Sequence, residues 1–223
     1  MAQSEPLRPW LLFWYGQFLM LIKRHSRALE VFRTVVRENP RHQQAWSCIA
    51  FLLAEREEFA AAIDAFERAL ALSPDDAASH FNVAFILQRT GRDEAAIPRF
   101  ERALEINAKV DRAWYGLGLS LAHLGRLEDA ATKLQEAARL QPFNPYAGYQ
   151  LAGVWHRLGR REKVRAEYER IKGFDPKVAE RIVIDLSRPS GRSGMLPAGA
   201  PPSRRTSCAS CLPSASPAAC ACG

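Results

Sequence analysis

Residues 111–142 read DRAWYGLGLSLAHLGRLEDAATKLQEAARLQP, and they contain two apolar-patterned segments separated by Gly125. In the first segment Trp114, Leu117 and Gly118 are spaced at i, i+3 and i+4, which places them on one face of a helix. The second segment carries alanine and leucine at helical spacing and ends at a proline. The stretch therefore predicts two helices joined by a tight turn.

The same pattern returns every 34 residues along the chain. An alanine, a phenylalanine and a proline recur at this interval, as Ala28, Ala62, Ala96 and Ala130, as Phe32, Phe66 and Phe100, and as Pro40, Pro74, Pro142 and Pro176, with Ala108 in the one gap of the proline series. A small residue recurs in each first segment, as Gly16, Ala50, Ala84, Gly118 and Ala152. A single helix pair cannot bury its apolar face alone, so this period predicts a stack of pairs.

The turn inside each copy and the small residues both have a physical reason. Gly91, Gly125 and Gly159 are predicted to end the first helices, because glycine tolerates a left-handed backbone. Lys23 stands at this break in the first copy, and Glu57 stands there in the second. The small residues are predicted to let two antiparallel helices approach closely.

The arrangement resembles the tetratricopeptide repeat family, whose 34-residue unit has Trp, Leu, Gly, Tyr, Ala, Phe, Ala and Pro at set places. The copy quoted above matches at Trp114, Leu117, Gly118, Gly125, Ala130, Ala137 and Pro142. His80 and Gly148 depart from the tryptophan, and Leu134 departs from the phenylalanine. The resemblance implies an all-α fold, a right-handed α-solenoid of about five helix pairs.

We predict five repeats over residues 9–178, at 9–42, 43–76, 77–110, 111–144 and 145–178. A capping helix is expected over 179–187, because its apolar residues fit one helical face and would cover the last repeat. Residues 188–223 are rich in Pro, Gly, Ser and Ala, and a disordered low-complexity tail is expected there.

The apolar run over residues 10–22 is predicted to be the first helix of the first repeat. It spans 13 residues, whereas a membrane-spanning helix needs about 20. Two alternatives stay open for this run: contact with a membrane, and an exposed apolar face that forms a homodimer surface. The expected compartment is the cytoplasm of a bacterium, and the alternative is a place peripheral to the inner membrane.

The net charge of +7 is concentrated in the tail, where four arginines and no acidic residue give +4. The repeats therefore carry only +3, and no basic stripe with a nucleic-acid motif occurs, so no nucleic-acid partner is expected. Cys48 is predicted to be a small packed hydrophobe. The tail holds Cys208, Cys211, Cys220 and Cys222, whose spacing makes them candidate zinc ligands; a tail without metal is preferred, and no cofactor is expected.

The family resemblance implies that the first helices line a concave groove that binds a peptide or a partner surface. We predict partner contacts at Phe51, Phe81, Asn82, Phe85, Arg89, Arg112, Tyr115, Leu119, Tyr146, Tyr149 and Arg157. The same inward face carries Phe13, Gln17, Gln44, Ser47 and His123. Asn82 and Arg112 match two of the five places at which some relatives bind chaperone C-termini, so no such specificity is expected.

These residues predict a non-catalytic scaffold or adaptor that binds a protein segment with apolar anchors and some negative charge. No hydrolase, metalloprotease or phosphate-loop motif occurs, so no catalysis is expected. The alternative is a membrane-associated assembly factor with tetratricopeptide repeats and a zinc-binding Cys-rich tail, which weakly resembles the lipopolysaccharide-assembly regulators.

Overall fold

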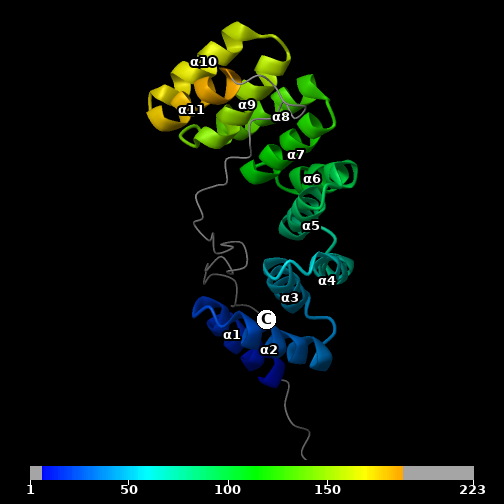
Figure 1. Ribbon diagram of the computed structural model, residues 1–223. Helices are drawn as coiled ribbons and strands as arrows, with labels where there is room; N and C mark the ends of the chain where they lie inside the picture. The colour runs from blue at the N-terminus through cyan, green and yellow to red at the C-terminus, as the bar shows by residue number, and fades with distance from the viewer. Residues whose placement is uncertain (1–6, 188–223) are drawn as a thin grey trace, which may run out of the picture. The chain divides into compact units, whose positions relative to one another are not determined.

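The computed structural model describes residues 7–187, and within them it contains eleven α-helices and no strand (Figure 1). The helices are α1 (Leu7–Leu21), α2 (His25–Glu38), α3 (Gln43–Glu55), α4 (Phe59–Leu72), α5 (Ala77–Arg89), α6 (Asp93–Ile106), α7 (Asp111–His123), α8 (Leu127–Leu140), α9 (Pro145–Arg157), α10 (Arg161–Lys172) and α11 (Pro176–Ser187). The predicted all-α fold of helix pairs is confirmed. The four tail cysteines lie outside the described residues.

The chain divides into two compact units, one ending at Asn82 and the other beginning at Val83. In unit 1, α1 packs against α2, α2 against α3, and α3 against α4. In unit 2, each helix from α6 to α11 packs against the next one along the chain. Contacts between consecutive helices are typical of repeat proteins, in which each hairpin buries its apolar face against its neighbour.

The same hydrogen-bonded turn joins the two helices of every pair. After α7, Gly125 has a φ of +80°, Arg126 N donates to Leu121 O at 2.9 Å, and Gly125 N donates to Ala122 O at 3.2 Å. These two bonds are those of a Schellman motif, which satisfies carbonyls at the helix end. Equivalent bonds and a positive φ occur at Lys23, Glu57, Gly91 and Gly159, at 34-residue intervals.

The left-handed turn predicts opposite effects for two substitutions. Lys23→Gly should raise the free energy of unfolding by up to about 1 kcal/mol, because a side chain at positive φ costs roughly 1–2 kcal/mol and glycine's extra chain entropy offsets part of that. Gly125→Ala should lower it by about 1 kcal/mol. A Cβ at Gly125 would meet no atom within 4 Å, so the loss would come from the backbone alone.

The measurement is the urea midpoint of each variant, followed by circular dichroism on the full chain. Midpoints that move in the same direction for both variants would contradict this role of the turn.

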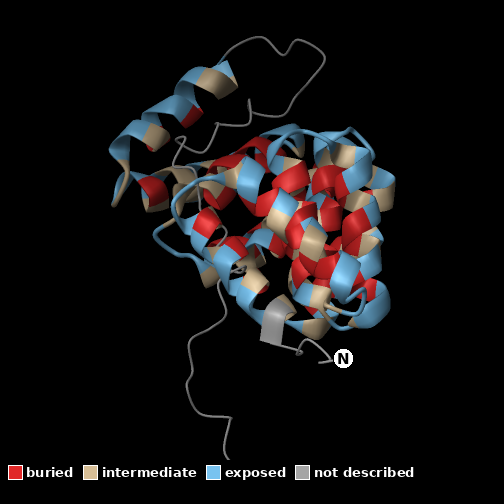
Figure 2. Ribbon diagram, turned by 90° about the horizontal axis from the view of Figure 1, so that it is seen from below, coloured by how far each residue is buried: buried red, intermediate tan, exposed pale blue. Residues whose placement is uncertain are grey.

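The helices of a pair approach closely where the repeated small residue lies. A Cβ added to Gly16 would lie 2.6 Å from Phe32 Cε1, and one added to Gly118 would lie 2.7 Å from Leu134 Cγ. Phe32 and Leu134 are fully buried, and Figure 2 shows buried residues gathered on the faces that the helices turn toward one another. The small residue on the first helix thus makes room for the bulky residue on the second.

After each of the second helices α2, α4, α6 and α8, a backbone carbonyl accepts a side-chain hydrogen bond from the next hairpin. Trp46 Nε1 donates to Pro40 O and Trp114 Nε1 to Ala108 O, both at 2.9 Å, and His80 Nε2 bonds Pro74 O at 3.0 Å. The last such carbonyl, Pro142 O, accepts a hydrogen bond from Arg170 Nη1 at 3.0 Å. His80 therefore replaces tryptophan in the same role.

Gly148 stands in the tryptophan slot of the last hairpin, and Arg170 fills the space above it. A Cβ at Gly148 would collide with Arg170 Nη2, and Glu167 holds that guanidinium by an ion pair of 2.9 Å. The departure from the family pattern at Gly148 thus leaves room for an arginine that makes the tryptophan's hydrogen bond.

The last helix, α11, packs against both α9 and α10 (Figure 1). Its buried Ala179 and Ile182 join a cluster with Tyr149, Ala152 and Ile171. This is the contact expected of a capping helix, because apolar residues of the last hairpin would otherwise face water.

Candidate functional site

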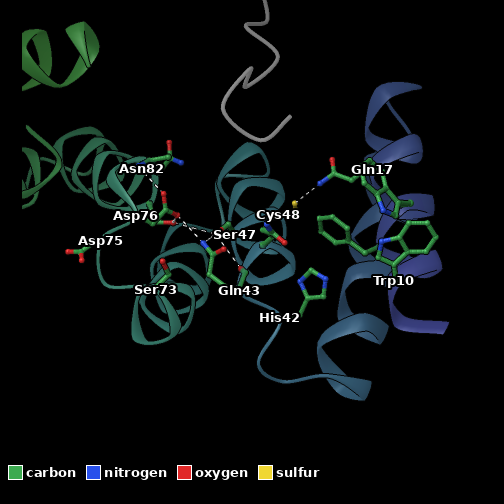
Figure 3. Close-up of a pocket in the computed structure, with 15 residues that line it drawn as sticks. Trp10, Gln17, His42, Gln43, Ser47, Cys48, Ser73, Asp75, Asp76 and Asn82 are labelled. Carbon is green, nitrogen blue, oxygen red and sulfur yellow. Dashed lines mark hydrogen bonds between the residues drawn. The ribbon is translucent and has the colours of Figure 1, made fainter. Parts of the chain in front are cut away.

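Unit 1 contains a pocket with a volume of about 500 Å³ (Figure 3). This lies within the range of roughly 300–1,000 Å³ that is common for ligand pockets. Its helical lining residues belong to α1, α3 and the start of α5: Trp10, Phe13, Trp14, Gln17, Gln43, Gln44, Ser47, Cys48, Ala78, Ser79 and Asn82. Four further residues, His42, Ser73, Asp75 and Asp76, come from the connections before α3 and α5.

An aromatic wall is supplied by α1. Trp10 and Trp14 are 57% and 45% exposed, and their rings meet edge to face with centroids 6.2 Å apart. Phe13 is buried beneath them, and its ring stacks at a tilt on His42 with centroids 4.6 Å apart. The two tryptophans thus present large apolar surfaces that a ligand could cover.

The opposite side of the pocket is polar and held by hydrogen bonds (Figure 3). Asp76 Oδ2 accepts from Gln43 Nε2 at 3.0 Å and from Ser79 Oγ at 2.6 Å, while Asp76 Oδ1 accepts from Ala78 N at 3.1 Å. Asp76 therefore caps the N-terminus of α5 and orients the side chain of Gln43 on α3. Ser47 Oγ lies 3.4 Å from Ser79 Oγ and continues this network.

His42 caps α3 at the edge of the pocket. Its Nδ1 accepts a hydrogen bond from Ala45 N at 3.3 Å, which requires the neutral ring. Burial lowers the pKa of His42 below 6.5, and a backbone hydrogen bond opposes this shift in part. The neutral ring is therefore the form that the folded protein favours at neutral pH.

The pKa of His42 predicts a stability change with pH. Since the pKa is lower in the folded than in the unfolded chain, the stabilisation is complete above pH 6.5 and is lost as pH falls through the folded value. His42→Asn keeps a capping side chain but does not titrate. The melting temperature of the wild type should therefore fall relative to this variant as pH drops from about 7 to about 5. Parallel profiles would contradict the prediction.

In unit 1 the structure separates the three predicted partner-binding residues. Asn82 lines the pocket, whereas Phe51 and Phe81 are not among its lining residues. Phe81 is only 8% exposed and Phe51 is half-buried. Phe81 therefore packs inside the protein rather than presenting its ring to a ligand.

In unit 2 the structure brings Tyr115 of α7 close to Tyr146 and Gln150 of α9. Burial raises the pKa of Tyr115 to about 12, a hydrogen bond with Gln150 lowers it, and the nearby Tyr146 raises it. Tyr115 also packs, half-buried, against the Ala137, Ala138 and Ala147 cluster. On α5 Phe85 (40% exposed) and Arg89 are exposed, and on α7 Arg112 is exposed and Leu119 half-buried.

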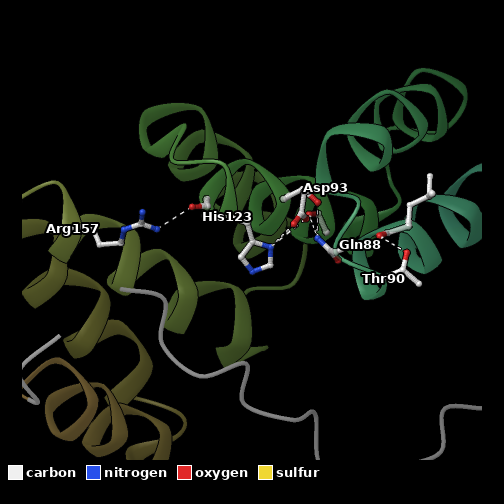
Figure 4. A network of polar contacts seen from close by, with 9 residues as sticks. Gln88, Thr90, Asp93, His123 and Arg157 are labelled. Atoms are coloured by element: carbon white, nitrogen blue, oxygen red, sulfur yellow. Dashed lines mark hydrogen bonds and ion pairs between the residues drawn. The ribbon is translucent and has the colours of Figure 1, made fainter. Parts of the chain in front are cut away.

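Two of the predicted contact residues, Tyr149 and Arg157, form hydrogen bonds with other residues of unit 2. Tyr149 is 3% exposed, and its hydroxyl donates to Asp185 on α11, so it belongs to the core beneath the cap. Burial and Asp185 together raise the pKa of Tyr149. Arg157 Nη1 donates to Ala122 O at 3.0 Å, and His123 contacts Asp93 at 3.1 Å (Figure 4). Tyr149 therefore has almost no surface that a ligand could contact.

The prediction from the sequence missed several pocket residues. Trp10 and Trp14 on α1 were not selected, because only the face expected to point inward was counted. Asp75 and Asp76 lie in a connection, so a count along helix faces does not include them. Two adjacent acids just before a first helix were the signal that could have found this wall.

The outer face of α1 is unusually apolar for an end helix. Its exposed large residues beyond the pocket are Leu11, Tyr15, Phe18 and Leu21, and the exposed Ile22 follows the helix directly. Among residues 7–187 no helix is long and apolar enough to cross a membrane. Contact with a membrane surface and homodimer formation through residues 10–22 both stay predictions. Within residues 7–187 no group of three metal-binding side chains occurs either.

Two models of the tetratricopeptide repeat match the chain, one over residues 41–109 and the other over residues 84–145. These matches identify residues 41–145 as tetratricopeptide repeats, the family that the sequence resembles. The resemblance found in the sequence is therefore confirmed. The fold is typical of scaffolds for protein interaction. No curated protein matches the chain in sequence.

Solved structures of similar fold include YrrB, described as a tetratricopeptide repeat protein with an unusual peptide-binding site. It is 19% identical, with a TM-score of 0.69 over 78% of this chain and 90% of that chain. MamA from residue 41 to its end, from Desulfovibrio magneticus RS-1, is 18% identical with a TM-score of 0.72, over 78% of this chain and 98% of that one. At these identities the likeness shows the fold.

Proposed function

We propose that the protein is a non-catalytic scaffold that binds a segment of a partner protein on the first helices of its hairpins. The observation that carries this proposal is the pocket of unit 1, since every helical residue that lines it belongs to α1, α3 or α5. The second helices α2 and α4 are occupied with packing, as their buried Phe32 and Phe66 illustrate. No residue of α2 or α4 lines the pocket.

The corresponding residues of unit 2 support a second contact region on the same class of helix. Phe85 and Arg112 are exposed, and Tyr115, Leu119 and Tyr146 are half-buried. Aromatic and arginine side chains supply much of the binding energy in protein interfaces. The arginine would favour a partner segment that carries some negative charge at this region.

A peptide-binding role is also suggested by analogy with YrrB, whose structure is described as having an unusual peptide-binding site. The analogy concerns the fold, and the contacts proposed for this chain come from its own residues. The identity of the partner does not follow from these contacts, so the test must work on whatever partner the cell supplies.

Site-specific photo-cross-linking in cells tests the proposal without disturbing the core. A photoreactive phenylalanine analogue would replace Gln44 or Arg112, which are exposed on first helices. As matched controls it would replace Asp64 or Thr132, which are exposed on second helices. We expect the same partner adduct from both first-helix positions and at least about tenfold less from the controls, because contact is needed for cross-linking and a specific contact dominates its surroundings.

The readout is the adduct band and its identity by mass spectrometry. Adducts that arise equally from Asp64 and Thr132 would reject the assignment of binding to the first helices.

A further inference from the structure

The pocket of unit 1 is lined by acidic side chains, whereas the candidate contact region of unit 2 carries arginines. Its lining includes the carboxylates of Asp75 and Asp76, and among its fifteen described lining residues there is no lysine or arginine. His42 adds no positive charge at neutral pH, because burial lowers the pKa of its ring below 6.5. The ionised side chains that line the pocket are therefore acidic at neutral pH.

The carboxylate of Asp76 is held in a fixed orientation. It receives the backbone N–H of Ala78, the hydroxyl of Ser79 and the amide of Gln43. These three donors are neutral, so they orient the carboxylate without cancelling its charge. An oriented carboxylate needs little rearrangement when a cation binds, which reduces the entropy that binding would cost.

The aromatic wall faces the same pocket. Trp10 and Trp14 are both about half exposed, and the face of an indole ring attracts a cation more strongly than the face of any other aromatic side chain. The protein already uses such contacts elsewhere, since the Arg68 guanidinium lies 5.0 Å from the Trp46 ring and Lys163 Nζ lies 4.0 Å from the Trp155 ring. Indole faces and carboxylates in one pocket favour a cationic group attached to an apolar stem.

The amide side chains in the pocket suit the backbone of an extended segment. Gln44 is exposed and Asn82 half-buried, and each amide offers both donors and acceptors, which a peptide group requires. A free metal ion would instead need converging oxygen ligands, and within residues 7–187 no cluster of three acidic, histidine or cysteine side chains supplies them.

We propose that this pocket binds an arginine or lysine side chain from a segment of the partner protein, with the stem of that side chain along the tryptophan wall and its cation on the acidic side of the pocket. This inference rests on the proposed scaffold function and specifies the partner at one of its sites. The positive charge of such a side chain complements the aspartates, and its apolar stem can lie along Trp10 and Trp14.

The first test is a positional peptide library applied to the full chain. Each pool contains acetylated, amidated octapeptides in which one position is fixed and the others are random. We expect pools with fixed arginine or lysine to retain several times more protein than pools with fixed aspartate or glutamate, at low salt, and the preference to weaken as salt screens the charges.

The second test uses one octapeptide chosen from the arginine pools and labelled with fluorescein, with binding followed by polarisation. The double variant Asp75→Asn, Asp76→Asn keeps the cap on α5 and removes both charges, and it should weaken binding about tenfold or more, the loss of one or two charge-assisted contacts. The double variant Trp10→Ala, Trp14→Ala should weaken it to a similar extent. Glu30→Gln with Asp64→Asn is the matched control, because it removes the same charge from exposed positions on α2 and α4 and should leave the affinity unchanged.

Three results would overturn the inference: preference for acidic pools, no retention by any pool, or equal weakening by the control variant. Cross-linking from Gln44 and Arg112 that persists under any of these results would leave the scaffold function standing and remove only the basic specificity.

Discussion

The reversal of the chain at a residue with positive φ, repeated five times at 34-residue intervals, is the constraint on which the rest of the structure depends. Each reversal closes a Schellman motif and returns a second helix along the first. The close approach of the two helices then requires a small residue on one and a bulky one on the other, as Gly118 and Leu134 show. A helix pair built in this way has an apolar face that only a neighbouring hairpin can cover.

A division of labour between helices follows from this packing. In α2, α4, α6 and α8 a phenylalanine or a leucine is fully buried, whereas the first helices of unit 1 keep exposed or half-buried side chains beside the connections that precede them. In unit 1 these side chains and connections enclose a pocket that has an aromatic wall and an acidic wall. In unit 2 the first helices carry arginine and tyrosine instead. The two proposed binding regions thus differ in charge, which would allow specificity without any change in fold.

The helix pairs, their turns and the close contacts were predictable from the sequence, because each depends on a residue type that recurs at a fixed interval. The candidate site was predictable only in part. Counting helix faces found Asn82 and the half-buried Tyr115, but it could not tell that Phe81 and Tyr149 would be buried, since that depends on neighbouring helices. The acidic connection beside α5 escaped the count because it lies between helices, where a count along helix faces does not reach. Arg170 above Gly148 was unpredictable because the two residues lie on different helices.

The central claim is that first helices recognise the partner while second helices hold the fold. The most direct test is a map of backbone amide chemical shifts in the full chain, with and without a bound partner segment. The account predicts changes concentrated on α1, α3, the start of α5 and the connections before them, with α2 and α4 nearly unchanged. Changes centred on the outward residues of α2 and α4 would contradict it.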